Sequence, residues 1–261
     1  MRTNILFVAA AFILIGAIGY SVYRLWDINT GYAQEAAMHS RLLSYRPTLM
    51  PTAVKAADIP TGIDAEAPAA PAAPVVNQGV VDLQAKYQDV VGWLTVPGTA
   101  IDHPFAQGKD NDHYLHHNLD GDMTPTGTIF LDYRNHKDLS DFYNIIFGHN
   151  MRNGSMFGTL QQFNDPDFFD SHDTYTLFLA EGTYTVEIMA FSVIYPNDAV
   201  IYNPYVTTEA ERLVFLGYVK NTARHYRDIK ATPDQQFITL STCNYEFNNG
   251  RMVLVGRLTA I

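Results

Sequence analysis

The longest apolar run in the chain covers residues 5–22, where every side chain is apolar or small, and Arg2 and Arg24 flank it. A helix of about 18 residues is just long enough to cross the hydrocarbon core of a membrane. Because no clear cleavage site follows at close range, we predict an uncleaved signal-anchor over residues 1–24. The bulk of the chain would then lie outside the cell. A cleaved signal peptide and a buried helix of a soluble protein are the alternatives.

The regular pattern is lost after this segment. Residues 25–49 mix polar and apolar positions, as a helical stalk does, and residues 47–79 are rich in Ala and Pro. Such a stretch cannot bury enough apolar surface to fold, and its prolines favour extended structure. We therefore predict a helical stalk and linker over residues 25–79, which hold a folded domain of residues 80–261 away from the membrane.

Within residues 80–261 the pattern changes to short apolar segments separated by turn residues. A short helix is predicted over residues 81–90, and strands are predicted after it. Short strands at regular intervals favour a mainly β fold, either a barrel or a sandwich. The predicted strands cover residues 92–96, 101–105, 128–132, 144–147, 175–180, 184–194, 237–242 and 252–258.

One long helix interrupts the strands, over residues 207–227. Thr207 or Thr208 can cap its first turn, and Glu209 and Glu211 follow at the end where the helix dipole favours negative charge. We predict that this helix is inserted directly before the strand that ends in the cysteine.

Composition narrows the possible functions. The net charge is -10 and basic residues form no stripe, which argues against nucleic acid as a partner. The hydrophobic content of 47% indicates a substantial core. The chain has one cysteine, Cys243, which cannot form an intramolecular disulfide. In an exported protein it is either an inert buried residue or a reactive thiol.

Two further residues make the reactive thiol plausible. Cys243 ends one predicted strand and Arg251 begins the next, so a hairpin would place them opposite each other. A cation beside a thiol favours the nucleophilic thiolate. A cysteine nucleophile also needs a partner that transfers protons, most often a histidine. His149 follows the apolar strand 144–147 and a glycine, although that position alone suits a structural histidine equally well.

Taken together, these stretches resemble the sortases, the cysteine transpeptidases of Gram-positive cell surfaces. The resemblance rests on Thr-Leu-Ser-Thr-Cys at residues 239–243, on the following Arg251, and on Gly-His-Asn-Met at residues 148–151. Residues 91–102, residues 127–135 and the long helix resemble class B sortases in particular. For residues 80–261 the resemblance implies an eight-stranded β-barrel with an inserted helix, preceded by N-terminal helices.

The resemblance also implies a reaction. Cys243 would be the nucleophile, His149 the acid and base, and Arg251 the third essential group. The enzyme would cleave a C-terminal sorting signal of an exported protein after Thr. It would hold the product as a thioester and pass it to an amine of a cell-wall precursor. The Arg251 guanidinium would either hold the substrate backbone or stabilise the oxyanion, and the sequence leaves both roles open.

Five further residues are candidates for substrate binding. Ser241 lies on the same face of its strand as Cys243, whereas Thr242 points to the opposite face. Asn111 and Leu115 are four residues apart, so they would share a helical face, and they match groove positions of class B sortases. Tyr202 either lines the same groove or packs the inserted helix onto the barrel.

Other functions remain open. Water as the acceptor would make the chain a cysteine protease that releases surface proteins. A lysine of a pilin subunit as the acceptor would make it a pilin-polymerising sortase. In a non-catalytic surface binding module, Cys243 would merely pack in the barrel.

No metal or cofactor is expected. Residues 110–122 hold His113, His116 and His117 among carboxylates, but we interpret this segment as a solvated polar stretch. His39 and His103 have no partner pattern in the sequence and are expected to be surface or structural residues.

Overall fold

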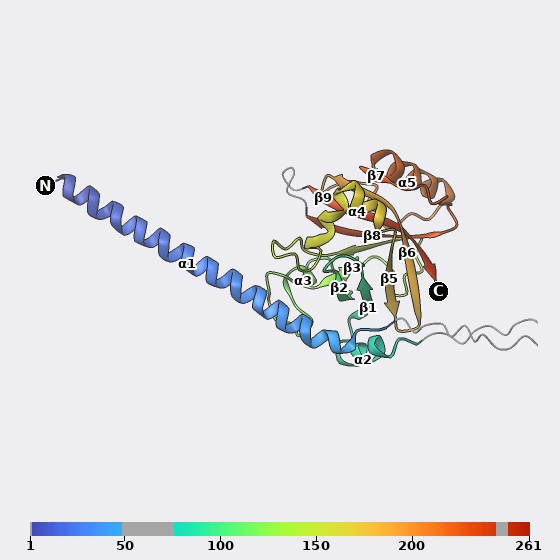
Figure 1. Cartoon of the computed structure of the whole chain (residues 1–261), viewed down its shortest axis with the longest axis horizontal. Coiled ribbons are helices and arrows are strands. Elements are labelled where there is room, and N and C mark those ends of the chain that lie inside the picture. The colour runs from blue at the N-terminus through green and yellow to red at the C-terminus, as the bar shows by residue number, and fades with distance from the viewer. Residues whose placement is uncertain (1, 49–75, 244–249) are drawn as a thin grey trace, which may run out of the picture.

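The computed structural model describes residues 2–48, 76–243 and 250–261, and these form a β-barrel with a long N-terminal helix (Figure 1). The hydrogen-bonded strand order is β5-β1-β2-β3-β4-β8-β9-β6-β7. A further pairing of β5 with β6 closes eight of these strands into a barrel, and the short β7 pairs with β6 as an antiparallel neighbour. The predicted mainly β fold, an eight-stranded barrel with N-terminal helices, is therefore confirmed.

The strands are β1 (Val90–Thr95), β2 (Asp102–Ala106), β3 (Ile129–Leu131), β4 (Tyr143–Phe147), β5 (Thr174–Leu179), β6 (Gly182–Ile194), β7 (His225–Tyr226), β8 (Gln236–Cys243) and β9 (Arg251–Ala260). The α-helices are α1 (Arg2–Leu42), α2 (Gln78–Lys86), α3 (His113–His116), α4 (Pro166–Ser171) and α5 (Glu209–Thr222). Two 3-10 helices are η1 (Leu43–Tyr45) and η2 (Gly158–Asn164). All eight predicted strands occur, each within two residues of its expected bounds. The helix predicted over residues 81–90 begins and ends earlier, because Val90 already pairs with Ala106 in the sheet.

Side chains that alternate between the two faces of each strand form two hydrophobic layers, one inside the barrel and one outside its wall. Along β8, Ile238 and Leu240 point into the barrel, where they join the large apolar cluster that fills it. Phe237 belongs instead to a second cluster between the barrel wall and α5. Because successive strand residues face opposite sides, Ser241 lies on the same side as Phe237, at the end of the strand nearest the cysteine.

Helix α5 is the inserted helix that the sequence predicted. Thr208 caps its N-terminus, and Thr208 and Glu211 form a capping box in which each side chain accepts from the other's backbone N–H. These backbone hydrogen bonds lower the pKa of the Glu211 carboxyl to about 2. The helix ends at Thr222 rather than at residue 227, because the Arg224 N–H donates to the Phe191 carbonyl of β6 (2.8 Å) and the chain joins the sheet as β7.

Helix α1 projects away from the barrel at its N-terminal end and lies against the barrel at its C-terminal end (Figure 1). Within the described part of the chain, one helical segment is long and apolar enough to cross a membrane. It covers Ala10–Tyr45, that is, most of α1 together with η1. Its last turns are held by apolar contacts, since Leu42 packs with Trp93 and Phe178 of the barrel wall. An ion pair between Arg46 and Asp102 adds a contact directly after the helix (2.8 Å).

Candidate active site

The strand topology brings the two ends that carry the candidate chemistry to one edge of the barrel. Strands β4 and β8 are parallel neighbours, with Phe147 paired to Ser241. The Gly148 N–H continues the pairing by donating to the Ser241 carbonyl (3.1 Å). His149 and Cys243 each follow the Phe147–Ser241 pair by two residues, so both lie at the same end of these two neighbouring strands.

The hairpin expected for Cys243 and Arg251 is present. Strands β8 and β9 are antiparallel, and Cys243 is the cross-strand partner of Arg251. Side chains of directly opposed residues in such a ladder start about 4.5–5.5 Å apart at their Cβ atoms. The side chain of Cys243 and residues 244–249 lie outside the described part of the chain.

His149 is held by a hydrogen bond to helix α3. Its Nε2 lies 2.7 Å from the backbone carbonyl oxygen of Leu115. A carbonyl oxygen only accepts, so Nε2 carries a proton and donates it. Nδ1 is therefore the ring nitrogen that remains for proton exchange with another group.

A groove of about 330 Å³ lies at this edge of the barrel. All seven predicted catalytic and substrate-binding residues whose side chains are described line it, together with five that the sequence did not single out as groove residues. The predicted residues are His149, Arg251, Ser241, Thr242, Asn111, Leu115 and Tyr202. The additional residues are Phe130, Arg134, Phe147, Gly148 and Pro196.

Comparison with known proteins agrees with this geometry. The Sortase domain family model matches residues 94–259. Sortase B of Listeria monocytogenes is 40% identical over 189 residues, which cover 70% of this chain and 75% of that protein. The chain belongs to the sortase family. The matches to sortase B and to solved class B sortases make it a sortase-type cysteine transpeptidase of class B.

Solved class B sortases have the same fold as this sortase. Sortase B from B. anthracis superimposes with a TM-score of 0.74 at 25% identity, covering 89% of this chain and all of that one (100%). A class B sortase of Streptococcus pyogenes that is involved in pilus biogenesis superimposes with a TM-score of 0.63 at 33% identity, covering 69% of this chain and 97% of that one.

A hydrogen bond between two hydroxyl groups joins Tyr202, on one wall of the sortase groove, to Ser241 of strand β8. The Tyr202 hydroxyl lies 2.9 Å from Ser241 Oγ, and the Tyr202 ring stacks on Phe147 with centroids 6.1 Å apart. Tyr202 therefore contacts β8 directly and lines the groove. Thr242 is buried and also lines it, although it alternates with Ser241 along the strand.

Arg134 positions this wall, a role that sequence reasoning missed. Its guanidinium binds the buried Asp132 through two hydrogen bonds (2.9 and 2.6 Å), and Asp132 raises the pKa of Arg134 above its usual range. It also donates to the backbone carbonyl of Tyr202 (3.1 Å). The signal in the sequence was the class B-like stretch at residues 127–135, which contains Arg134 but does not indicate its contact with Tyr202.

Asn111 and Leu115 have structural contacts besides facing the groove. The Asn111 side-chain oxygen accepts from the Tyr133 N–H (3.0 Å), and the Leu115 carbonyl accepts from His149. The shared helical face expected for the two residues is wrong, because α3 begins at His113 and Asn111 lies in the loop before it. The two residues border the groove from this loop and from α3.

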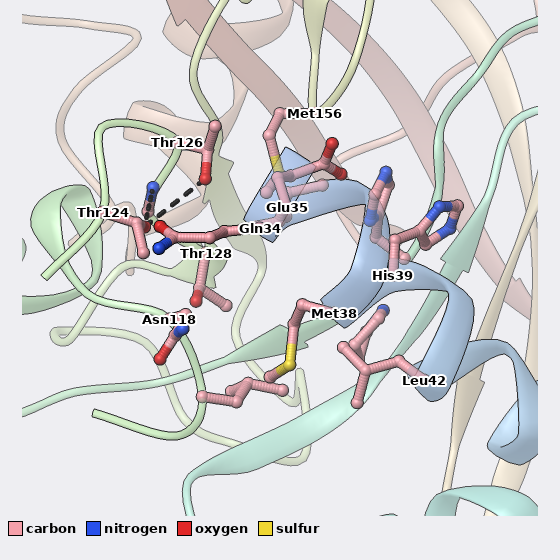
Figure 2. A pocket seen from close by; sticks show the side chains of 15 residues that line it. Gln34, Glu35, Met38, His39, Leu42, Asn118, Thr124, Thr126, Thr128 and Met156 are labelled. Atoms are coloured by element: carbon pink, nitrogen blue, oxygen red, sulfur yellow. Dashed lines mark hydrogen bonds between the residues drawn. The ribbon is translucent and has the colours of Figure 1, made fainter. Parts of the chain in front are cut away.

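A second polar cluster lies apart from the groove, where α1 meets β2. Glu35 and His39 project from one face of α1 toward the barrel (Figure 2), and the His39 ring stacks on His103 with centroids 4.2 Å apart. His103 is buried, and burial and the neighbouring His39 lower its pKa to about 3. The sequence treated these histidines as unrelated, because they are far apart along the chain.

Proposed function

We propose that this sortase cleaves the C-terminal sorting signal of an exported protein after a Thr residue and transfers the new carboxyl end to an amine of the cell wall. The observation that carries this proposal is the shared groove. His149, Arg251 and the substrate-binding candidates line one cavity at the end of the strand that Cys243 terminates.

In the first half-reaction the Cys243 thiolate adds to the Thr carbonyl carbon of the sorting signal. The tetrahedral intermediate then collapses, the peptide C–N bond breaks, and a thioester remains on Cys243. His149 donates a proton to the departing amine. The His149–Leu115 hydrogen bond supports this role, because it keeps the ring oriented and leaves Nδ1 as the exchanging nitrogen.

In the second half-reaction an amine attacks the thioester carbonyl. His149, now neutral, accepts a proton from this amine, a new amide forms and the Cys243 thiolate is released. His149 thereby regains the proton that it donated in the first half-reaction. The enzyme returns to its starting state, and the reaction needs no cofactor.

Arg251 is proposed to act on the substrate carbonyl or backbone. Its position opposite Cys243 in the β8–β9 ladder supports either role, because the two residues lie at the same end of the hairpin and a guanidinium offers a planar fork of donors to a carbonyl or an oxyanion. Ser241, Thr242, Asn111, Leu115 and Tyr202 are proposed to bind the sorting signal, because they surround the same groove.

We further propose that residues 1–24 anchor the enzyme as a single-pass membrane protein, with residues 25–79 as stalk and linker and residues 80–261 as the extracellular catalytic domain. The apolar sequence of α1 supports the anchor. The contacts of Leu42 and Arg46 with the barrel indicate that the end of the stalk packs on the catalytic domain.

A pilin-polymerising activity is the second candidate. The class B sortase of Streptococcus pyogenes in the comparison is involved in pilus biogenesis, so the acceptor amine of this sortase need not belong to the cell wall. The same residues would also support a hydrolase, with water as the acceptor. A non-catalytic binding module is the least favoured alternative.

The test uses the full chain in detergent with a library of sorting-signal peptides, with and without an amine acceptor, and identifies products by mass spectrometry. Cleavage after Thr with an amine-ligated product supports transpeptidation and identifies the signal. Free acid that no amine diverts supports the protease. No cleavage of any peptide contradicts the catalytic proposal.

A further inference from the structure

We propose that Glu35, His39 and His103 form a Zn²⁺ site that fixes helix α1 to the barrel, separate from the catalytic groove. Two of these residues come from the helix and the third from β2. A bound ion would therefore join the membrane-proximal helix to the catalytic domain.

The spacing of the donor groups fits one ion. Glu35 and His39 are four residues apart, so they share one face of α1 (Figure 2). One ligand atom from each of the three residues lies within 4.8 Å of the other two. Ligand atoms around a tetrahedral Zn²⁺ are about 3.3 Å apart, given Zn–N and Zn–O distances of about 2 Å. Completing the site therefore requires side-chain rotations that close the cluster by up to about 1.5 Å and turn the His39 and His103 rings out of their stack, because the lone pair of a ring nitrogen lies in the ring plane.

The orientation of His39 also suits a ligand. Its Nε2 lies 2.9 Å from the Asp102 carbonyl oxygen, which only accepts, so Nε2 donates and the lone pair remains on Nδ1. Histidines that bind metals usually donate their other ring N–H to a carbonyl or carboxylate in this way. Asp102, which accepts this hydrogen bond, precedes His103 in β2. Two adjacent residues of β2 therefore orient one proposed ligand, His39, and supply another, His103.

Charge favours a cation at this place. Glu35 is only 9% exposed, and burial raises the pKa of its carboxyl although His39 and a Ser155 hydrogen bond favour its charged form. A buried carboxylate is costly, and a divalent ion bound by one carboxylate and two imidazoles would reduce that cost. Two imidazoles and one carboxylate form a set that Zn²⁺ takes with one position open.

The site has an entry path. Glu35, His39 and His103 line a cavity of about 40 Å³ on one side and a more open one of about 330 Å³ on the other. Ser155 and Asn153 border the larger cavity, so water or a hydroxyl can occupy the fourth position.

The test measures Zn²⁺ binding by calorimetry to the full chain in detergent. The Cys243→Ala background prevents the single thiol from binding the metal. One Zn²⁺ per chain is expected, with at least a tenfold loss of affinity in Glu35→Gln and in His39→Gln. His117→Gln is the matched control, because His113 and His117 are also stacked at a spacing of four but are less buried than His103, with His113 exposed and His117 half-buried. Absence of binding, or affinity that neither ligand substitution changes, would overturn the site.

A second measurement tests the fixing of the helix. The Cys243→Ala chain has no other cysteine, so Ala37→Cys and Lys137→Cys, both exposed, place spin labels on α1 and on the barrel. Zn²⁺ is expected to narrow the distribution of distances between the labels, and Glu35→Gln is expected to abolish the narrowing. Zn²⁺ binding that leaves the distribution unchanged would contradict the proposed link between helix and barrel.

Discussion

His149 donates its Nε2 proton to the carbonyl oxygen of Leu115, at 2.7 Å. This contact joins the proposed acid and base to helix α3, which also borders the substrate groove. One ring nitrogen is therefore committed to the fold, and the other is left for chemistry.

His149→Ala should lower kcat/KM by about 10²–10⁴-fold, the range that a positioned general acid and base supplies. The measurement is the rate of cleavage of a sorting-signal peptide, with circular dichroism to confirm the fold. His113→Ala, an exposed histidine of α3, is the matched control and should retain activity. Equal rates in both variants would remove His149 from the mechanism.

Arg251→Lys separates charge from the guanidinium fork. Lysine keeps the positive charge but loses the planar set of donors, so we expect a loss of at least about tenfold in kcat/KM. A loss in kcat alone assigns Arg251 to the oxyanion, whereas a rise in KM assigns it to substrate binding. Arg257→Lys, further along β9 and bonded to Glu187, should leave both parameters near those of the unchanged enzyme. An unaltered rate in Arg251→Lys would show that the fork is dispensable.

The hydroxyl pair of Tyr202 and Ser241 can be tested by a double-mutant cycle. Tyr202→Phe and Ser241→Ala should each reduce the free energy of unfolding by about 0.5–1.5 kcal/mol, the usual net contribution of one hydrogen bond. Because both variants remove the same bond, the double variant should lose less than their sum. Urea unfolding provides the measurement, and Tyr205→Phe, an exposed tyrosine, is the control. Strictly additive losses would show that the two hydroxyls do not interact.

The capping box of α5 predicts a dependence of stability on pH. The pKa of Glu211 is lowered to about 2 in the folded chain, whereas its ordinary value is 4.5, so the unfolded chain binds the proton first as pH falls. The stabilisation from Glu211 is present above pH 4.5 and disappears progressively toward pH 2. In Glu211→Gln the loss of stability between these pH values should be smaller, measured by urea unfolding. Glu209→Gln, in the same helical turn, is the control, and an identical slope in both variants would contradict the capping role.

Local pattern was sufficient for much of the fold. The eight strands follow from short apolar segments between turns, and the pairing of Cys243 with Arg251 follows from one hairpin. A threonine cap for α5 follows from the order of threonine and glutamate in the chain, and the structure selects Thr208 over Thr207. Each of these features depends on residues that are close in sequence.

Features that depend on distant residues were not predicted. His39 and His103 meet only because the last turns of α1 fold back onto β2, and no local pattern encodes that contact. The role of Arg134 was not predicted, because its hydrogen bond to the Tyr202 backbone spans 68 residues. In the same way, β7 forms only because α5 ends beside β6.

The most direct test of the account is the mass of the enzyme itself. The full chain is incubated with a cleavable sorting-signal peptide in the absence of an amine, quenched in acid and analysed by intact and peptide mass spectrometry. We predict an acyl adduct that maps to Cys243, is released by hydroxylamine and does not form in Cys243→Ala. Peptide cleavage that continues in Cys243→Ala, or an adduct on another residue, would contradict the assignment of Cys243 as the nucleophile.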